Sequence, residues 1–312
     1  MAYHKVDLSK IKTIPLNIRR CKVSLKDFAK TGEKRQSFKI FYESLPDILA
    51  SKNLKTVVSG VVRAHKTKKQ VIFMMGAHVI KCGLSPLVID LMRKGVVKAV
   101  ALNGAGIIHD TEIAMIGRTS EDVGEGIVDG TFGMAKETAS LINEAINSGV
   151  KDGFGIGEAV GRRIVRDKLP NRSLSILATG CEMKIPVTVH VALGTDIIHQ
   201  HPSANGEAIG EGSLLDFRNF IYSVSRLEGG VAINFGSAVI LPEVFLKAVT
   251  VARNLGYKIR NLTTANFDMI SQYRPYQNIL SRPTSSGGKG YSIIGHHEIM
   301  IPLLYRAIIE EI

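Results

Sequence analysis

The chain has 312 residues, of which 45% are hydrophobic and 22% are charged. This is the composition of a folded globular protein, and it excludes a disordered or collagen-like chain. No apolar run approaches the roughly 20 residues that cross a bilayer, so we expect no membrane span. The opening MAYHKVDLSKIK has no apolar signal region, and we therefore expect a cytoplasmic protein. The cysteines Cys21, Cys82 and Cys181 are too few and too far apart to indicate a disulfide framework or a CxxC metal site.

Positive charge dominates the chain and is concentrated at its start. The formal net charge is +12, and residues 1–39 carry eleven Lys or Arg against Asp7, Asp27 and Glu33. Such a segment can bind nucleic acid or an acidic protein, or it can form a solvated surface. We favour the solvated surface over nucleic acid because the chain has no RNA-binding signature, no Trp and only 6% aromatic residues. We interpret residues 1–37 as a basic arm and residues 38–312 as one domain.

Beyond the arm, strand-like and helix-like patterns alternate along the chain. A helix is predicted over Phe38 to Ala50, and QVIFMMGAHVI (70–80) begins as a buried strand. A helix over residues 85–94 follows, because its Ser-Pro opening suits an N-cap and a first helical turn. The strand VVKAVAL (96–102) completes a strand–helix–strand unit, the crossover that joins parallel strands.

The same alternation continues to the end of the sequence. Helices are predicted within 119–170, over 213–227, from Pro242 to near Gly256 and from Glu298, strands at 185–193, 229–235, 258–267 and 291–295, and a polar loop at 268–290. This order predicts an α/β fold: a Rossmann-like, doubly wound and mostly parallel sheet with helices on both faces. The run Gly155-Ile-Gly157-Glu-Ala-Val-Gly161 follows helical residues rather than a strand, so we interpret it as close helix packing and not as a dinucleotide fingerprint.

Small and polar residues follow several of the predicted strands. Ligands of open α/β sheets bind beyond the carboxyl ends of the strands, and small residues let backbone N–H groups approach a phosphate. We therefore predict a cofactor cleft. The segments that would form it are Gly76-Ala77-His78, Asn103-Gly104-Ala105-Gly106, Gly194-Thr195-Asp196, Gly236-Ser237 and Thr263-Thr264-Ala265.

Acidic residues lie beside these segments in an otherwise basic protein. A cleft lined with carboxylates would favour a cationic, amine-like substrate, whereas a single carboxylate is as well explained by a helix cap or a surface charge. The residues concerned are Asp110, Asp196, Glu211, Asp216, Glu243 and Asp268.

Histidines form three short clusters, His109-Asp110, His199-Gln-His201 and His296-His297-Glu298. Two histidines and a carboxylate can hold zinc or iron, which keeps a metal-dependent hydrolase or lyase using His199, His201 and His296 as an alternative. Because HxH occurs in many loops and the chain has no HExxH motif, we assign these histidines to hydrogen bonding or acid–base work and assign no metal.

Lys289 lies in the glycine-rich segment Ser285-Ser-Gly-Gly-Lys-Gly290. A flexible loop of this kind can fold over a site, and a desolvated lysine amine can form a Schiff base. An exposed loop lysine is the alternative interpretation. The segment lacks the GxxxxGK[ST] spacing of a P-loop.

The order of these motifs resembles that of deoxyhypusine synthase, from about Phe38 to the end of the chain. The part from Gly76 to Asn103-Gly-Ala-Gly106 resembles the family's first nucleotide-binding unit, and Asp110 falls where the family places a glutamate near the cofactor ribose. The other matching segments are Ile185-Pro-Val187, Glu211-Gly-Ser-Leu-Leu-Asp216, Asn234-Phe-Gly-Ser-Ala-Val239, Thr264-Ala-Asn-Phe-Asp268, Ser285-Ser-Gly-Gly288 and Ile301-Pro-Leu-Leu304. The family's histidine pair is replaced by Pro242 and Glu243, and its tryptophan is absent.

The resemblance implies a specific chemistry, in which NAD takes a hydride from spermidine and an aminobutyl group passes through an enzyme lysine to an acceptor protein. It also implies a homotetramer with sites at subunit interfaces. We therefore expect an NAD-dependent transferase that acts on a polyamine-like amine through a lysine imine. A non-catalytic protein that binds NAD is a further alternative.

The resemblance also assigns roles to residues. Lys289 would be the covalent nucleophile, and His109 or His296 would move protons. The predicted amine-binding residues are Asp216, Glu243 and Asp268, and the predicted NAD-binding residues are Asn103, Gly104, Ala105, Gly106, Asp110, Gly236, Ser237, Thr264 and Ala265.

Overall fold

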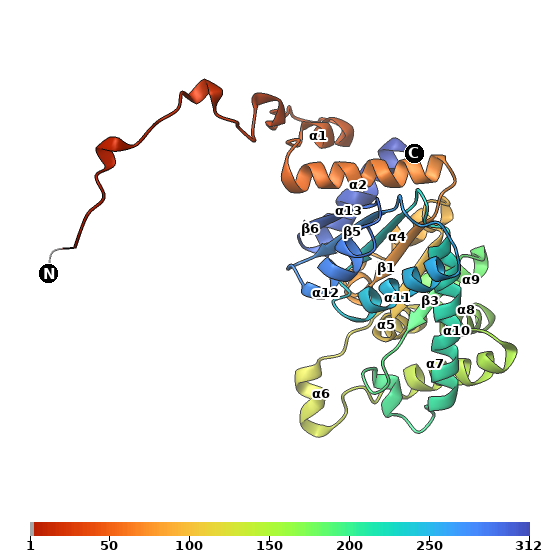
Figure 1. The fold of residues 1–312 in the computed structure, drawn as a ribbon. Helices are drawn as coiled ribbons and strands as arrows, with labels where there is room; N and C mark the ends of the chain where they lie inside the picture. The colour runs from red at the N-terminus through yellow and green to blue at the C-terminus, as the bar shows by residue number, and fades with distance from the viewer. Residues whose placement is uncertain (1–2) are drawn as a thin grey trace.

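The computed structural model describes residues 3–312 (Figure 1). Its centre is one sheet of six parallel strands in the order β3-β2-β1-β4-β5-β6. The strands are β1 (Val71–Met75), β2 (Ala99–Asn103), β3 (Val187–His190), β4 (Val231–Phe235), β5 (Thr263–Asp268) and β6 (Lys289–Ile294). The order runs outward from β1 in both directions, which confirms the predicted doubly wound α/β fold.

Helices connect the strands and cover the sheet. They are α1 (Phe38–Ser44), α2 (Leu49–Lys66), α3 (His78–Lys81), α4 (Ser85–Arg93), α5 (Gly104–Ile116), α6 (Val123–Asp129), α7 (Lys136–Gly149), α8 (Ile156–Arg166), α9 (Ile176–Met183), α10 (Gly206–Ser225), α11 (Ile240–Asn254), α12 (Tyr273–Pro275) and α13 (His297–Glu311). In the described residues, no helix is both long and apolar enough to cross a membrane.

Both faces of the sheet are buried, and the side chains of β1 show how. Phe73 belongs to a core shared with α2, α4, α5 and α13, whereas its neighbour Met74 belongs to a second core shared with α10 and α11. Successive strand residues point to opposite faces, so this alternation places helices on both sides. Because no face of β1 meets water, the strand is a continuous apolar run.

Two connections differ from the sequence prediction. The predicted first helix is divided, since Leu45 has ψ 143° before Pro46, and a residue before proline is disfavoured in a helix. The predicted polar loop 268–290 instead contains α12 and a π-helical turn, Tyr276–Ser281, whose Ile279 and Leu280 are buried. The buried leucine and isoleucine explain why this segment folds back onto the sheet.

The segment before α1 extends away from the sheet (Figure 1). It holds three short 3-10 turns, Leu8–Lys10, Leu16–Ile18 and Leu25–Asp27, and none of their residues is buried. The division between an arm and a domain at residue 37 stays a prediction.

The glycine run at 155–161 packs elements together, as the sequence predicts. A Cβ on Gly157 would lie 1.8 Å from the backbone oxygen of Val187 in β3, and one on Gly161 would lie 2.6 Å from that of Leu177 in α9. Glycine is therefore required there for α8 to approach its neighbours.

We predict that Gly157→Ala lowers the free energy of unfolding by about 3 kcal/mol, because the new methyl group overpacks against backbone that cannot move alone. Urea denaturation measures this change. Gly210→Ala in α10 is the matched control, since its Cβ would meet no atom within 4 Å, and it should stabilise the protein by about 0.5–1 kcal/mol. Equal effects of the two substitutions would contradict the packing role of Gly157.

Candidate active site

The strand order reverses between β1 and β4, and glycines mark the turn after each of these strands. A Cβ on Gly76 would lie 2.9 Å from the backbone oxygen of Gly236, and a Cβ on Gly236 would lie 2.4 Å from Cε1 of His297. Gly236 also has φ +64°, a conformation that favours glycine. The two turns therefore pack against each other and against His297 at the reversal, and the crevice where doubly wound folds bind their ligands lies beyond them.

A second predicted cofactor turn, at the start of α5, is covered by the chain itself. Asn103 caps the helix by accepting a hydrogen bond from the Gly106 N–H at 3.1 Å. A Cβ on Gly104 would lie 1.8 Å from Oδ2 of Asp196, so this carboxylate sits directly against the first turn. The positive end of the α5 dipole therefore already faces the Asp196 carboxylate. This carboxylate lies where a phosphate was predicted to bind.

Asp196 is nearly enclosed. Its side chain is 8% exposed, its Oδ2 has no hydrogen-bond partner, and burial raises its pKa to about 6. An unpaired buried carboxylate is unfavourable unless a cation or donor can reach it.

Next to Asp196 lies a cavity of about 230 Å³, between α5, α6 and the loop after β3. Its charged lining residues are Glu112, Glu121, Asp196 and Lys81. Three carboxylates face a single ammonium group, so the cavity favours a cationic ligand.

His109 lines the same cavity and belongs to a hydrogen-bonded chain. Its Nδ1 lies 2.6 Å from Oγ1 of Thr119, and Thr119 in turn donates its only hydroxyl proton to Glu112. The imidazole must therefore donate from Nδ1, which leaves Nε2 as a proton acceptor. Burial lowers the pKa of His109, so the ring is neutral near pH 7.

Two of the predicted site carboxylates serve the fold instead. Asp110 is fully buried and accepts hydrogen bonds from the backbone N–H groups of Ile176 and Leu177, at 2.8 and 3.3 Å, which caps α9. Asp216 is 1% exposed, and its Oδ2 accepts from the N–H groups of Gly157 and Val189, at 2.9 and 2.8 Å. Burial raises the pKa of Asp110 to about 6 and that of Asp216 to about 7. Both carboxylates are thus held by backbone donors, and their roles toward a ribose or an amine stay predictions.

The two other carboxylates that were predicted to bind the amine lie near the β4–β5 side. Glu243 in α11 pairs with Lys247 and Arg274, and the Lys247 ammonium holds the pKa of Glu243 below its usual value. Asp268 ends β5 at the carboxyl edge, where it accepts from the Met269 N–H at 2.8 Å and from Nε2 of Gln272 at 3.1 Å.

Three other predicted residues lie at the amino half of the sheet. Thr264 and Ala265 are buried near the start of β5, and Lys289 is the exposed first residue of β6, where it pairs in register with Thr263. The predicted strand 258–267 begins five residues before β5 and ends one residue before it, so Thr264 and Ala265 lie inside the strand and not in the turn after it. Within one chain, Lys289 does not reach the crevice at the opposite edge.

The histidines of the metal alternative are not brought together. His199 accepts from the Gly194 N–H, and His201 bonds the Gly133 carbonyl oxygen at 2.8 Å, both in the loop after β3. His296 precedes α13, which packs beside β5 and α2. β3 and β5 are separated by three strands in the sheet order.

Glu112 and Glu121 were not singled out from the sequence, and His78, Cys82 and His297 were named there without being joined in one group. The spacing of four between His78 and Cys82 places both on one side of a helical turn, and this signal was available. Burial raises the pKa of the Cys82 thiol, and Glu298, whose Oε2 lies 3.9 Å from Sγ, adds to the shift.

Comparison with known proteins shows the fold. No family model matches the sequence, and neither does any curated protein. A solved Entamoeba histolytica protein described as a deoxyhypusine synthase aligns over 89% of this chain and 95% of its own, with TM-score 0.54 and 12% identity. A Methanococcus maripaludis S2 protein described as LOR/SDH aligns over 96% of this chain and 76% of its own, with TM-score 0.52 and 15% identity.

The complex of AgrE with ornithine and NAD+ has TM-score 0.54 and 15% identity over 83% of this chain, which spans 33% of the AgrE chain. An arginine dihydrolase of the cyanobacterial ornithine–ammonia cycle, ArgZ, has TM-score 0.51 and 13% identity, and this chain likewise spans 33% of its length. The remote likeness to deoxyhypusine synthase that the motif order predicts is thus confirmed at the level of the fold.

We predict that Asp110→Asn lowers the free energy of unfolding by about 2–4 kcal/mol, because the amide places a donor against backbone N–H groups that lose their acceptor. The affinity for NAD, measured by calorimetry on the folded variant, should stay within about twofold of the wild type. A variant of normal stability that loses NAD affinity would instead support the ribose-binding role.

Proposed function

We propose that this chain is an NAD-dependent enzyme that oxidises a small primary or secondary amine. The observation that carries the proposal is the reversal of strand order between β1 and β4, where the turns at Gly76 and Gly236 bring backbone close together at the carboxyl edge of the sheet. The neighbouring acidic cavity supports an amine as the substrate. The remote likeness to proteins such as AgrE, solved with NAD+, agrees with the cofactor.

The residues present fit a dinucleotide at this crevice. In the doubly wound order found here, the turn after the first strand holds the pyrophosphate, and the end of the second strand binds the ribose. Gly76 and Ala77 occupy the first position, and the Asn103 amide ends the second strand. Gly236 and Ser237 would border the nicotinamide half. A bound nicotinamide would supply a hydride acceptor for the carbon that carries the amine.

The residues that line the cavity would bind the substrate and accept its proton. Glu112, Glu121 and Asp196 would bind the ammonium form of the amine. His109, with Nε2 free to accept, would take the proton that the nitrogen must lose before its neighbouring carbon can be oxidised. Thr119 and Glu112 hold the ring in this tautomer, because the hydroxyl proton is committed to the carboxylate.

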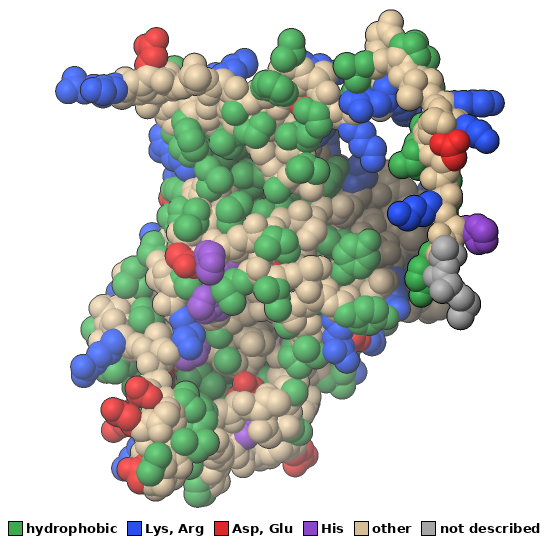
Figure 2. Space-filling model, turned by 90° about the vertical axis from the view of Figure 1, so that its left-hand side faces the viewer, with side chains coloured by type: hydrophobic (Ala, Val, Ile, Leu, Met, Phe, Trp, Pro, Cys, Tyr) green, Lys and Arg blue, Asp and Glu red, His purple; other side chains and the backbone are tan. Residues whose placement is uncertain are grey.

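A transfer through a lysine imine would need Lys289 from another copy of the chain. Figure 2 shows hydrophobic side chains spread over one face of the molecule. Exposed apolar residues beyond the carboxyl ends of β5 and β6 include Ile270, Tyr273 and Ile299, which are 62%, 69% and 63% exposed. Covering such a surface favours association of copies, and we propose a homo-oligomer.

We predict that NAD binds the purified protein with micromolar affinity in a calorimetric titration, after bound nucleotide has been removed. Ala77→Glu should weaken NAD at least about tenfold, since a carboxylate would face the pyrophosphate. Ala77→Ser should keep the wild-type affinity, because it adds only a small neutral group. Wild-type protein that binds no NAD at millimolar concentration would overturn the proposal, and binding without NADH formation from any amine would leave a non-catalytic NAD-binding protein.

We predict opposite effects of Asp196→Asn on stability and on amine binding. Folding raises the pKa of this carboxyl from 3.8 to about 6. The folded protein therefore binds the proton more tightly than the unfolded chain does. This contribution to the free energy of unfolding is fully present below pH 4 and is lost as the pH rises through 6. The amide carries no charge, so the free energy of unfolding of the variant should exceed that of the wild type by about 3 kcal/mol at pH 8 and by little at pH 4. Its KM for amines should rise at least about tenfold, and an unchanged KM would remove Asp196 from the amine site.

A further inference from the structure

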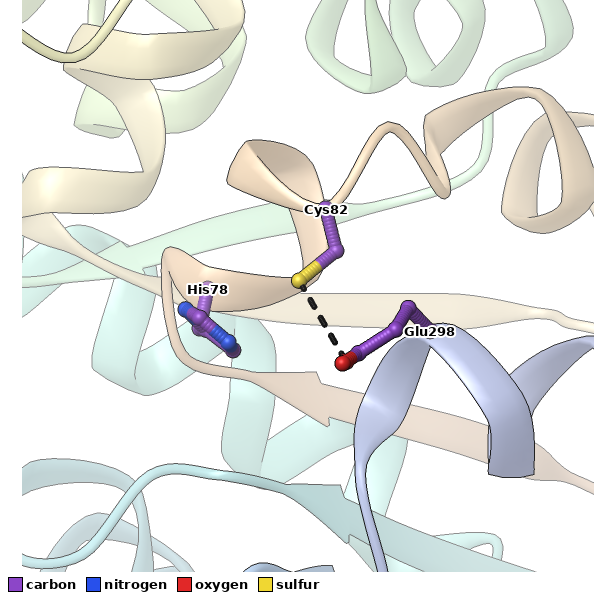
Figure 3. Close-up of side chains that lie close together, drawn as sticks. All are labelled: His78, Cys82 and Glu298. Carbon is purple, nitrogen blue, oxygen red and sulfur yellow. Dashed lines mark hydrogen bonds between the residues drawn. The ribbon is translucent and has the colours of Figure 1, made fainter.

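Three side chains with metal-binding atoms converge beyond the carboxyl ends of β1 and β6 (Figure 3). His78 lies in α3, Cys82 caps the end of that helix, and Glu298 lies in the first turn of α13. One ligand atom from each residue lies within 4.8 Å of the other two, and Cys82 Sγ lies 3.9 Å from Glu298 Oε2. Among residues 3–312, no other group of three or more His, Cys, Asp or Glu side chains brings its ligand atoms this close together.

The backbone explains why these atoms meet. The Cys82 N–H donates to the His78 carbonyl oxygen at 2.9 Å, so the two residues are one helical turn apart and share a side of α3. Tetrahedral zinc, with bonds of roughly 2.0–2.3 Å, places its ligand atoms about 3.5 Å apart. His78 and Glu298 are exposed and Cys82 is half-buried. Small rotations of these side chains would therefore bring the three ligand atoms to the spacing that zinc requires.

An independent observation next to this group also indicates a ligand. His297 is 2% exposed, its Nε2 lies 3.1 Å from the Phe267 carbonyl oxygen, and its buried Nδ1 has no partner. Its ring centroid lies 5.7 Å from that of His78. A buried nitrogen without a partner is unfavourable, and such atoms in native proteins commonly mark an ion or water that the site binds.

We propose that His78, Cys82 and Glu298 bind a zinc-class divalent metal ion. A thiolate and an imidazole select zinc and related ions over Mg²⁺ and Ca²⁺, which prefer oxygen ligands. The thiolate and carboxylate charges balance the charge of the ion, and the thiol proton is released on binding. Three protein ligands leave the fourth position open for water or a substrate atom.

The location gives this ion a place beside the proposed reaction. His78 directly follows Gly76-Ala77 after β1, and His297 touches the turn after β4 at Gly236. The turn after β1 would thus be shared by the proposed dinucleotide site and the metal site. The metal site itself stands on its own ligands and does not depend on NAD binding.

The test uses cobalt, which reports its ligands by absorbance. Full-length protein without a His-tag, stripped by a chelator and kept free of NAD, is titrated with Co²⁺. We expect one equivalent to bind, with visible bands of a four-coordinate ion and a near-ultraviolet thiolate-to-cobalt band, and Zn²⁺ to displace it. Cys82→Ser should abolish the thiolate band, whereas Cys181→Ser and Cys21→Ser should keep it.

His78→Ala and Glu298→Gln should each weaken Co²⁺ by more than about tenfold, because losing even a group that only supports a ligand costs about 10–100-fold. Absence of stoichiometric binding would overturn the proposal, as would a thiolate band that survives Cys82→Ser. Since no nucleotide is present, either result leaves the NAD proposal to its own titration.

Discussion

The architecture depends on the close approach of two backbone turns where the sheet reverses its order. β1 and β4 lie side by side, and their helical connections leave on opposite faces. At the carboxyl edge between these strands, only glycine fits where Gly76 meets Gly236 and where Gly236 meets His297. Every group that we assign to chemistry is positioned by elements that start at this edge.

Buried carboxylates are the second organising feature of the protein. Asp110, Asp196 and Asp216 each lie against the first turn of a helix that belongs to another part of the chain, namely α9, α5 and α8. The helix ends offset part of the cost of burying these charges. Asp110 and Asp216 are satisfied by backbone N–H groups, whereas Asp196 keeps an oxygen without a partner beside an acidic cavity. This difference separates the two structural carboxylates from the one that can bind a substrate.

The sequence carried most of the information about the fold. Apolar runs bounded by small residues, such as 71–75 and 231–235, must be strands buried on both faces, and the helical stretches between them leave few alternatives to a parallel sheet. Likewise, Gly157 could be recognised as a packing glycine because no strand precedes its run.

The candidate site was less predictable, for physical reasons. Asp110 and Asp216 look like site residues because a buried cap and a ligand-binding carboxylate have the same local sequence. Lys289 looked like a loop lysine because the start of β6 is rich in glycine, and only strand pairing with β5 shows that it lies at the amino edge. The approach of Asp196 to Gly104, and that of Glu298 to Cys82, depends on contacts between segments about 90 and 216 residues apart in the chain.

The central claim is that a dinucleotide binds at the β1–β4 reversal and not at the start of α5, which Asp196 already covers. A crystal structure of the protein soaked with saturating NAD tests it most directly. Our account predicts a pyrophosphate on the backbone of Gly76 and Ala77, with the nicotinamide half toward Gly236 and Ser237 and with Asp196 unmoved. An ordered dinucleotide at Gly104–Gly106 with Asp196 displaced, or a crevice that stays empty, would contradict it.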